Sequence, residues 1–227
     1  NIVLPSGAKI LDVGCGEGRH IFGSLQAFKQ AYCVGYDQHI PSLNICKDGL
    51  AFFQELDSGA TIFVQGSVYK LPFEDNSFDL IFCSEVLEHL DDYHLALDEI
   101  HRVLKSGGKF LPSVPSFWPE KICWMLSIDY QNMPGGHVRI FKKNQVISEI
   151  TNHGFVYEKS ERFHGLHSAY WWLRCIFWKT QESNWLVRQY KKFLEYQILQ
   201  NPSWLKKIEN CMNPLFGKSI AFYFQKK

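Results

Sequence analysis

Short apolar runs alternate with longer amphipathic segments along the first 110 residues. The apolar runs predict strands that are covered on both faces of a sheet, and the segments between them have the period of helices. Strands are expected at residues 9–13, 32–36, 61–65, 78–83 and 109–114, and helices at 18–28, from Pro41 onward and at 90–104. This alternation predicts an α/β fold built from parallel βαβ units.

The pattern changes after Val114. Residues 115–136 are rich in proline, glycine and aromatic side chains, which predicts a loop with a short helix near 121–127. Beyond this loop, helices are expected at 142–153, 168–179, 183–199 and 202–211, and strands at 155–159 and 219–224. We therefore divide the chain into a sheet domain, residues 1–162 and 217–227, and a helical insert, residues 163–216.

The two predicted parts differ in charge. Residues 1–162 carry 14 Lys and Arg against 20 Asp and Glu, whereas residues 163–227 carry 10 against 3. Most of the tryptophans also lie in the second stretch: Trp171, Trp172, Trp178, Trp185 and Trp204. An acidic part and a basic, aromatic part indicate different binding partners.

The overall composition excludes several classes of protein. Of 227 residues, 46% are hydrophobic and 21% are charged, which is typical of a globular chain. No apolar run is long enough to predict a transmembrane helix. Seven cysteines without a C-x-x-C pair, two of them (Cys33 and Cys83) inside apolar runs, predict reduced thiols in a cytoplasmic protein. Because the sequence begins at Asn1 rather than Met, we expect residues before it.

A glycine-rich turn follows the first predicted strand, where LDVGCGEGR at 11–19 places glycines at 14, 16 and 18. Glycine lets a ligand approach the main chain, and the start of the following helix offers unpaired N–H groups. The G-x-G-x-G spacing differs from the G-x-G-x-x-G of dinucleotide-binding proteins. A plain tight turn would use the same residues, but the position between strand and helix favours a ligand-binding loop.

An acidic residue ends the second predicted strand. Asp37 lies 23 residues after Gly14, where a carboxylate can accept hydrogen bonds from both hydroxyls of a ribose. The alternative is an aspartate that caps the helix beginning near Pro41. The glycine loop upstream favours the ribose role.

Four stretches together resemble the class I S-adenosylmethionine-dependent methyltransferases (type 11), the broad group that includes the quinone-biosynthesis methyltransferases. They are LDVGCGEGRH at 11–20, VGYD at 34–37, GSVYKLPFEDNSFDLIFCSEVLEHL at 66–90 and EIHRVLKSGGKF at 99–110. The resemblance implies a Rossmann-like, seven-stranded sheet with helices on both faces, whose antiparallel last strand is inserted between strands five and six. It also implies S-adenosylmethionine as the cofactor.

The resemblance assigns cofactor contacts to residues that follow the carboxyl ends of strands. The methionine part would face Asp12 and the backbone of the loop, namely Gly14, Cys15, Gly16 and Gly18. Asp37 would hold the ribose hydroxyls, and Gln38 would lie beside the adenine.

The remaining implied contacts follow strands three and four. Ser67 and Val68 would frame the adenine, and the hydroxyl of Ser67 stands where many relatives have Asp. Ser84 and Glu85 would lie along the cofactor near its sulfonium.

Three residues are candidates for a general base, which is needed only if the acceptor must lose a proton, as a hydroxyl does. Glu88 and His89 follow the fourth predicted strand, and His137 lies in the loop after the fifth. Each has a structural alternative, either a helix start with local hydrogen bonds or a packed loop. Nearby acidic residues are expected on a solvated helix start and face: Asp91, Asp92, Asp98 and Glu99.

Candidates for acceptor binding lie in the aromatic part of the chain. Trp118 and Trp171 would line an apolar pocket, and Arg139 would bind an anionic or hydroxylated acceptor. His164 and His167 lie just beyond the sixth predicted strand and would line the same pocket. Two histidines without a third ligand are weak evidence for a metal, so none is expected.

The segment YWWLRCIFW at 170–178 predicts a helix that is apolar nearly all round. It would pack on the sheet as extra core, or form a lid over a large apolar pocket. As a third option, residues 168–207 would form a peripheral membrane contact, because tryptophans with flanking basic residues suit an anionic interface. The basic residues form no dense run, so a nucleic-acid partner is not expected.

These features predict an S-adenosylmethionine-dependent methyltransferase that acts on a small or lipophilic acceptor, with oxygen favoured over carbon. The alternatives are an NAD-type oxidoreductase and a non-catalytic cofactor-binding module. The glycine spacing disfavours the first, and the intact glycine loop with Asp37 disfavours the second.

Overall fold

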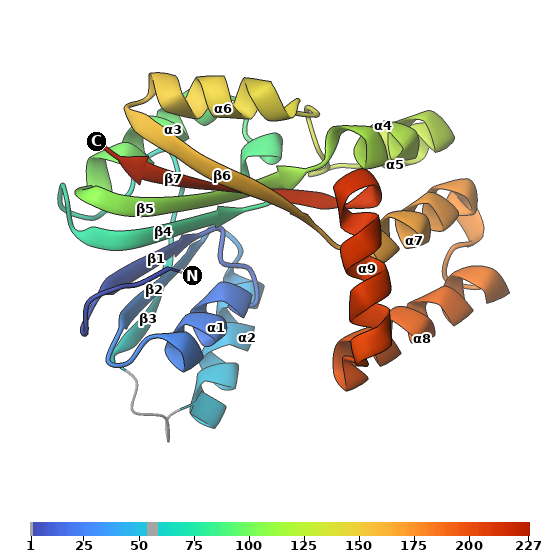
Figure 1. The fold of residues 1–227 in the computed structure, drawn as a ribbon, viewed down its shortest axis with the longest axis horizontal. Helices are drawn as coiled ribbons and strands as arrows, with labels where there is room; N and C mark the ends of the chain where they lie inside the picture. The colour runs from blue at the N-terminus through green and yellow to red at the C-terminus, as the bar shows by residue number, and fades with distance from the viewer. Residues whose placement is uncertain (1, 54–58) are drawn as a thin grey trace. The chain divides into compact units, whose positions relative to one another are not determined.

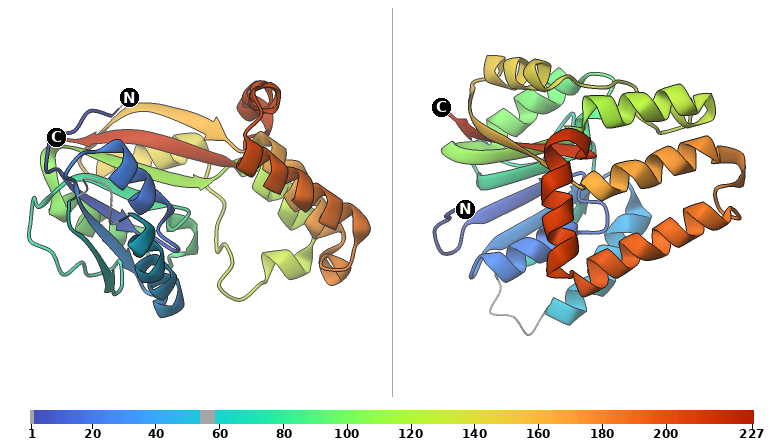
Figure 2. Two further views of the ribbon diagram at one scale, coloured as in Figure 1. Left: turned by 90° about the horizontal axis from the view of Figure 1, so that it is seen from below. Right: turned by 45° about the vertical axis from the view of Figure 1, so that its right-hand side comes forward.

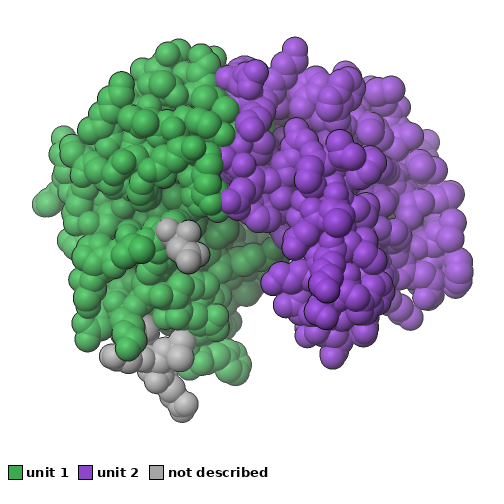
Figure 3. Space-filling view, viewed as in Figure 1, with its two compact units in different colours: residues 1–113, 147–159, 222–227 green, residues 114–146, 160–221 purple. Residues whose placement is uncertain are grey.

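The computed structural model describes residues 2–53 and 59–227. The chain forms two compact units, which Figure 3 shows in different colours. The first unit comprises residues 1–113, 147–159 and 222–227, and the second comprises 114–146 and 160–221. The second unit thus contains the expected insert, residues 163–216, together with the segment after Val114.

A seven-stranded sheet runs through the fold in the order β3-β2-β1-β4-β5-β7-β6 (Figure 1). Its strands are β1 (Lys9–Val13), β2 (Tyr32–Asp37), β3 (Thr61–Gln65), β4 (Phe78–Ser84), β5 (Leu104–Pro115), β6 (Phe155–Phe163) and β7 (Ser219–Lys226). Strands β1 to β5 pair in parallel, and β7 is antiparallel and lies between β5 and β6. The predicted fold class is confirmed.

Helices cover both faces of the sheet in the first unit. Helices α1 (Arg19–Ala27) and α2 (Ile40–Leu50) lie on one face, and α3 (Tyr93–Val103) lies on the other (Figure 1). The carboxylate of Asp92 accepts a hydrogen bond from the His94 backbone and caps α3. Shorter elements are η1 (Ala51–Phe53) and η2 (Leu87–His89), and α6 (Lys143–Asn152) precedes β6. The sheet and these helices place the carboxyl ends of β1 to β4 at one edge.

Strand β5 begins five residues earlier than predicted. The sequence pattern placed a helix stop at Ser106-Gly107-Gly108, whereas α3 ends at Val103 and β5 starts at once. The pairing register with β4 shifts between Leu104 and Lys109, and Gly107 has a φ of 76°. The glycines therefore form a bulge inside the strand.

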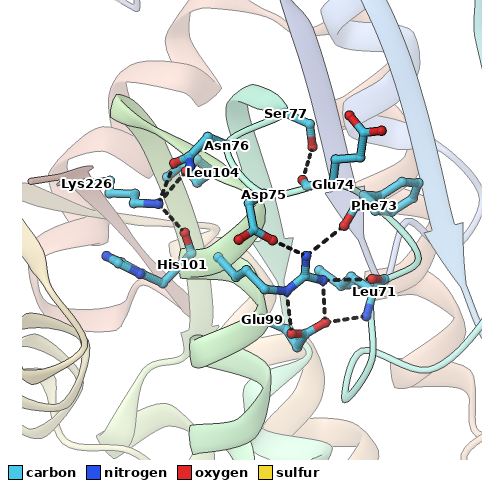
Figure 4. A network of polar contacts seen from close by, with 11 residues as sticks. Leu71, Phe73, Glu74, Asp75, Asn76, Ser77, Glu99, His101, Leu104 and Lys226 are labelled. Carbon is cyan, nitrogen blue, oxygen red and sulfur yellow. Dashed lines mark hydrogen bonds and ion pairs between the residues drawn. The ribbon is translucent and has the colours of Figure 1, made fainter.

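Figure 4 shows a network of polar contacts that includes Glu99 and Asp75, and Arg102 at the end of α3 is its main donor. Its guanidinium donates to the carboxylates of Glu99 and Asp75 and to the carbonyl oxygens of Leu71 and Phe73. The hydrogen bond from Arg102 lowers the pKa of Glu99. Glu99 is thus a partner of Arg102, and the prediction that it lies on a solvated face was wrong.

The second unit is mainly helical. It holds α4 (Phe117–Leu126), α5 (Ile128–Gln131), α7 (Gly165–Ile176), η3 (Trp178–Thr180), α8 (Trp185–Gln200) and α9 (Ser203–Phe216). Helices α7, α8 and α9 share an apolar cluster around Leu166, Leu194 and Leu205 (Figure 2). A second cluster joins α4 and α5 to α7 and includes Trp171. Across the described ranges, no helix has both the length and the apolarity that crossing a bilayer requires.

Candidate functional site

The glycine loop lies between β1 and α1 as predicted. Gly14, Gly16 and Gly18 all have positive φ values, of 72°, 51° and 81°. The backbone N–H of Gly14 donates to the carbonyl oxygen of Tyr36 at 2.7 Å. A Cβ atom on Gly14 would lie 2.3 Å from Cγ2 of Val86, so glycine is required there.

The structure brings Asp37 against this loop. One carboxylate oxygen of Asp37 accepts from the backbone N–H of Gly16 at 2.8 Å, and the other accepts from the backbone N–H of His39 at 2.8 Å. These bonds fix the orientation of the carboxylate and leave lone pairs on both oxygens. Asp37 therefore couples the end of β2 to the glycine loop.

Asp12 is a buried carboxylate at the end of β1 in the first unit. Its side chain is fully buried at the end of β1, and neither carboxylate oxygen has a hydrogen-bond partner among the described residues. Burial, and then the negative charge of Asp37, raise the pKa of Asp12 to about 7. A buried carboxylate without a partner destabilises the fold unless a ligand supplies a cation or a donor.

The other residues assigned to the cofactor lie at or shortly after the carboxyl ends of β1, β2, β3 and β4. The hydroxyl of Tyr36 donates to the carbonyl oxygen of Ser67 at 3.2 Å, which ties the segment after β3 to β2. Gln38 is exposed, and its carbonyl oxygen accepts from the side-chain Nε2 of Gln65 at 3.3 Å. The thiol of Cys15 is buried in the core, so a ligand can reach only its backbone. Further candidates of this group are half-buried where strands end: Val68, Ser84 and Glu85.

The segment after β4 contributes two of the base candidates. Glu85 has a φ of 55° and accepts from the hydroxyl of Ser113 at 3.0 Å. In η2, Glu88 is fully buried, whereas His89 is exposed. Of these two, His89 is therefore the group that solvent reaches.

The second unit contains a buried charge network that the sequence pattern did not reveal. Glu120 on α4 is fully buried and accepts from the hydroxyl of Tyr130 at 2.8 Å and from Lys218. Its Oε1 also lies 2.8 Å from Nδ1 of His137. Burial favours the neutral carboxyl, but the hydrogen bond from His137 and the charge of Lys218 outweigh it and lower the pKa of Glu120 to about 2. Glu120 thus orients the imidazole of His137.

The aromatic helix α7 packs within the second unit rather than standing free. The indole N–H of Trp172 donates to the carbonyl oxygen of Pro119 at 3.0 Å. The ring of Trp171 lies under the guanidinium of Arg174 at 4.8 Å and under Nζ of Lys218 at 5.6 Å. These contacts support the extra-core interpretation for these two tryptophans. Trp118, in contrast, is 67% exposed.

The remaining acceptor candidates divide into two groups. The guanidinium of Arg139 lies 5.9 Å from the ring centre of Phe141. His164 and His167 lie at the start of α7, and Nδ1 of His167 lies 4.0 Å from Oε1 of Glu209 on α9. Sequence reasoning missed Glu209 because it is 42 residues away from His167.

Known proteins resemble this chain both in sequence and in fold. Residues 11–111 match the family described as a methyltransferase domain. This part of the chain is therefore similar to a methyltransferase domain. The matched residues run from β1 into β5 and include every residue assigned above to the cofactor.

Curated relatives match the same region of the chain. A sterol 24-C-methyltransferase of Gibberella zeae is 37% identical over 110 residues, which is 48% of this chain and 28% of that protein. A demethylmenaquinone methyltransferase of Staphylococcus epidermidis is 33% identical over 121 residues, which is 50% of this chain and 48% of that protein. The chain spans less than half the length of the curated relatives it matches.

Solved methyltransferase structures share the fold. A geranyl diphosphate methyltransferase, solved with geranyl diphosphate and sinefungin, superposes with a TM-score of 0.65. The superposition covers 99% of this chain and 74% of the other at 14% identity. This likeness concerns the fold alone.

The resemblance to methyltransferases implies S-adenosylmethionine as the cofactor, and the residues of the first unit fit it. The unpaired carboxylate of Asp12 can receive an ammonium group, and Asp37 presents free lone pairs to hydroxyl groups. Nothing lies within 4 Å of the position that a Cβ on Gly16 would take, so the loop leaves room for a ligand against its backbone. The residues that the sequence assigned to the cofactor therefore suit its amino-acid and ribose parts.

Proposed function

We propose that this protein transfers a methyl group from S-adenosylmethionine to a small or lipophilic acceptor. The observation that carries the proposal is the buried carboxylate of Asp12, which has no partner within the described residues although its burial is complete. Such a group destabilises the free protein, and a cationic ligand at this position offsets that cost. The carboxylate lies directly before the glycine loop, where the family binds its cofactor.

When bound, the cofactor supplies an electrophilic methyl group and a neutral leaving sulfide. Asp12 binds the ammonium group, and the carboxylate of Asp37 accepts from the ribose hydroxyls. Because Gly16 and His39 already hold that carboxylate, little side-chain entropy is lost on binding. These residues orient the donor, and alignment of the reacting atoms contributes most of the acceleration in a displacement of this kind.

Oxygen is the favoured acceptor atom because the protein offers a positioned base. Glu120 fixes the orientation of the His137 imidazole through the 2.8 Å contact of its Oε1 with Nδ1, and this imidazole is one candidate to take a proton from a hydroxyl. Glu88 and His89 are the other candidates. Carbon is the second candidate acceptor, since a sterol 24-C-methyltransferase is among the relatives.

The surface of the second unit supports a proposal for the acceptor class. This unit carries 13 Lys and Arg against 6 Asp and Glu, and it exposes large apolar side chains. The most exposed of these are Leu199, Met125, Leu215, Trp118 and Trp185. A basic surface with exposed apolar groups suits a lipophilic acceptor with an anionic group, bound through Trp118 and Arg139, or contact with an anionic membrane.

Titration calorimetry with S-adenosylhomocysteine and, separately, with NAD distinguishes the proposed activity from its main alternative. We expect binding of the first and none of the second at matched concentrations. Tight binding of NAD alone would establish the oxidoreductase alternative.

A radiolabelled methyl-transfer assay against lipid extracts then tests catalysis. Incorporation into a lipid fraction is expected. Cofactor binding without incorporation into any lipid or small-molecule fraction would favour the non-catalytic binding module.

A further inference from the structure

Two histidines and a glutamate converge where α7 begins beside α9. Each of His164, His167 and Glu209 offers one ligand atom, and the three atoms lie within 4.8 Å of one another. All three residues belong to the second unit. Imidazole nitrogen and carboxylate oxygen are the ligands that divalent transition metals such as Zn²⁺ take in three-ligand protein sites.

The backbone at the start of α7 places both imidazoles on one side. His164 has a left-handed conformation with a φ of 65°, and its carbonyl oxygen accepts from the backbone N–H of His167 at 3.0 Å. The two rings have centroids 5.0 Å apart. The backbone at the start of α7 thus brings His164, which precedes the helix, next to His167 in its first turn.

Close packing of α7 on α9 brings the glutamate to the two imidazoles. A Cβ on Gly165 would lie 3.0 Å from Cβ of Met212 on α9, so only glycine allows this approach without a shift. The backbone N–H of Gly165 also donates to the side chain of Asn213 at 2.9 Å. Glu209 lies four residues before Asn213 and therefore on the same face of α9.

Only one of the two carboxylate oxygens of Glu209 accepts a hydrogen bond among the described residues. Its Oε2 accepts from Nε2 of Gln197 on α8 at 2.7 Å. Its Oε1 is buried and has no hydrogen-bond partner among residues 2–53 and 59–227. The separation of 4.0 Å between this atom and Nδ1 of His167 is too long for a hydrogen bond, whereas two ligand atoms of one tetrahedral Zn²⁺ ion lie about 3.4 Å apart, which a small side-chain movement would reach.

We propose that His164, His167 and Glu209 bind a divalent transition-metal ion of the Zn²⁺ type. The ion would join the first turn of α7 to α9, and side-chain movements of about 1 Å would bring all three ligands to bonding distance. Because His164 is exposed, water would complete the coordination. This inference does not depend on the proposed methyl transfer.

A comparable group in the first unit provides the control. His94 stacks on His153 with ring centroids 5.3 Å apart, and Nδ1 of His94 lies 3.9 Å from Glu149. In this group, however, Nδ1 of His153 already makes a hydrogen bond of 2.8 Å to a backbone carbonyl oxygen. It therefore has the same residue types as the proposed site without three convergent ligand atoms.

The test is titration calorimetry of the full chain with Zn²⁺ at pH 7.5, after removal of any affinity tag. All proteins carry Cys211→Ser, because Cys211 is an exposed thiol that could bind zinc. We expect one zinc ion per chain with a micromolar or lower Kd. Affinity should fall by about 100-fold in His167→Ala and in Glu209→Gln, and should stay within about twofold in His94→Ala.

Co²⁺ absorption and thermal melting supply readouts that do not depend on activity. Co²⁺ should give visible absorption bands in the control variant that are lost in His167→Ala, and Zn²⁺ should raise the Tm of the control variant alone. If His167→Ala does not fold, Glu209→Gln, which keeps the size of the side chain, decides the question. The proposal is overturned if 100 µM Zn²⁺ does not bind, or if neither variant weakens binding.

Discussion

Asp12 in the first unit and Glu120 in the second are both completely buried carboxylates, yet their surroundings are opposite. Asp12 has no hydrogen-bond partner within the described ranges, and its pKa is raised to about 7. Glu120 has His137, Lys218 and Tyr130 as partners, and its pKa is lowered to about 2. The first arrangement needs a ligand to complete it, whereas the second is complete within the protein.

The two units also differ in net charge. The first carries 11 Lys and Arg against 17 Asp and Glu, and the second carries 13 against 6. We infer that the acidic unit serves the cationic cofactor and that the basic unit serves an apolar or anionic acceptor.

The largest effect is expected from Glu120→Ala, which leaves Lys218 buried without its counter-charge. The free energy of unfolding should fall by about 3–5 kcal/mol at pH 7, as measured by urea denaturation. Because the pKa of Glu120 is lower in the folded state than in the unfolded state, its contribution is present above about pH 4.5 and is lost as the pH falls towards 2. A variant with unchanged stability would show that this charge network is not structural.

Asp12→Asn should have the opposite effect on stability. The pKa of Asp12 is raised by folding, so the wild type loses stability as the pH rises from about 4 through 7. The difference in the free energy of unfolding between the variant and the wild type should therefore grow by about 2–4 kcal/mol in favour of the variant as the pH rises from 4 to 8. Urea denaturation at each pH measures this difference. The matched control is Asp79→Asn, because Asp79 pairs with Lys105 and accepts from the Lys9 backbone. That variant should lose stability, and a gain in both would refute the contrast.

Asp37→Ala should weaken S-adenosylhomocysteine binding by about 100-fold. The substitution removes an acceptor for two hydroxyls and also releases the backbone of Gly16, and hydrogen bonds to a charged group contribute about 1.5–3 kcal/mol each. Calorimetry measures the loss, and Asp75→Ala, which removes an exposed partner of Arg102, should leave affinity unchanged. Equal affinities in the two variants would contradict the ribose assignment.

The smallest effect on stability is expected from Trp185→Ala with Trp204→Ala, because these side chains are 67% and 55% exposed. Stability should change by less than about 0.5 kcal/mol per site, while sedimentation with anionic vesicles should decrease about tenfold. Phe52→Ala is the control, since Phe52 is 87% exposed but belongs to the acidic unit. Similar losses in both would argue against a membrane contact specific to the second unit.

Local patterns predicted the first half of the fold well. The bounds of β1 and β3 and the glycine loop follow from apolar runs and glycine positions, and the structure confirms them. The start of β5 did not follow, because the glycines that usually end a helix form a bulge here. A strand bulge and a helix stop use the same residue for the same conformational reason.

Contacts between residues far apart in the sequence could not be predicted from the sequence. Glu120 meets Lys218 across 98 residues of chain, and neither belongs to a recognisable motif. Glu209 likewise lacks a pattern that would connect it to the histidines of α7. Cofactor contacts could be predicted from the sequence because the candidate residues follow successive strands, whereas contacts in the second unit depend on how its helices pack.

The central claim is that Asp12 is left unpaired for the ammonium group of the cofactor. Calorimetric titration with S-adenosylhomocysteine at pH 7, in two buffers of different ionisation enthalpy, tests it directly. The wild type should release about half a proton on binding, because its half-protonated carboxyl must ionise, and Asp12→Asn should release none. Binding of equal strength in both proteins, without proton release in either, would contradict the claim.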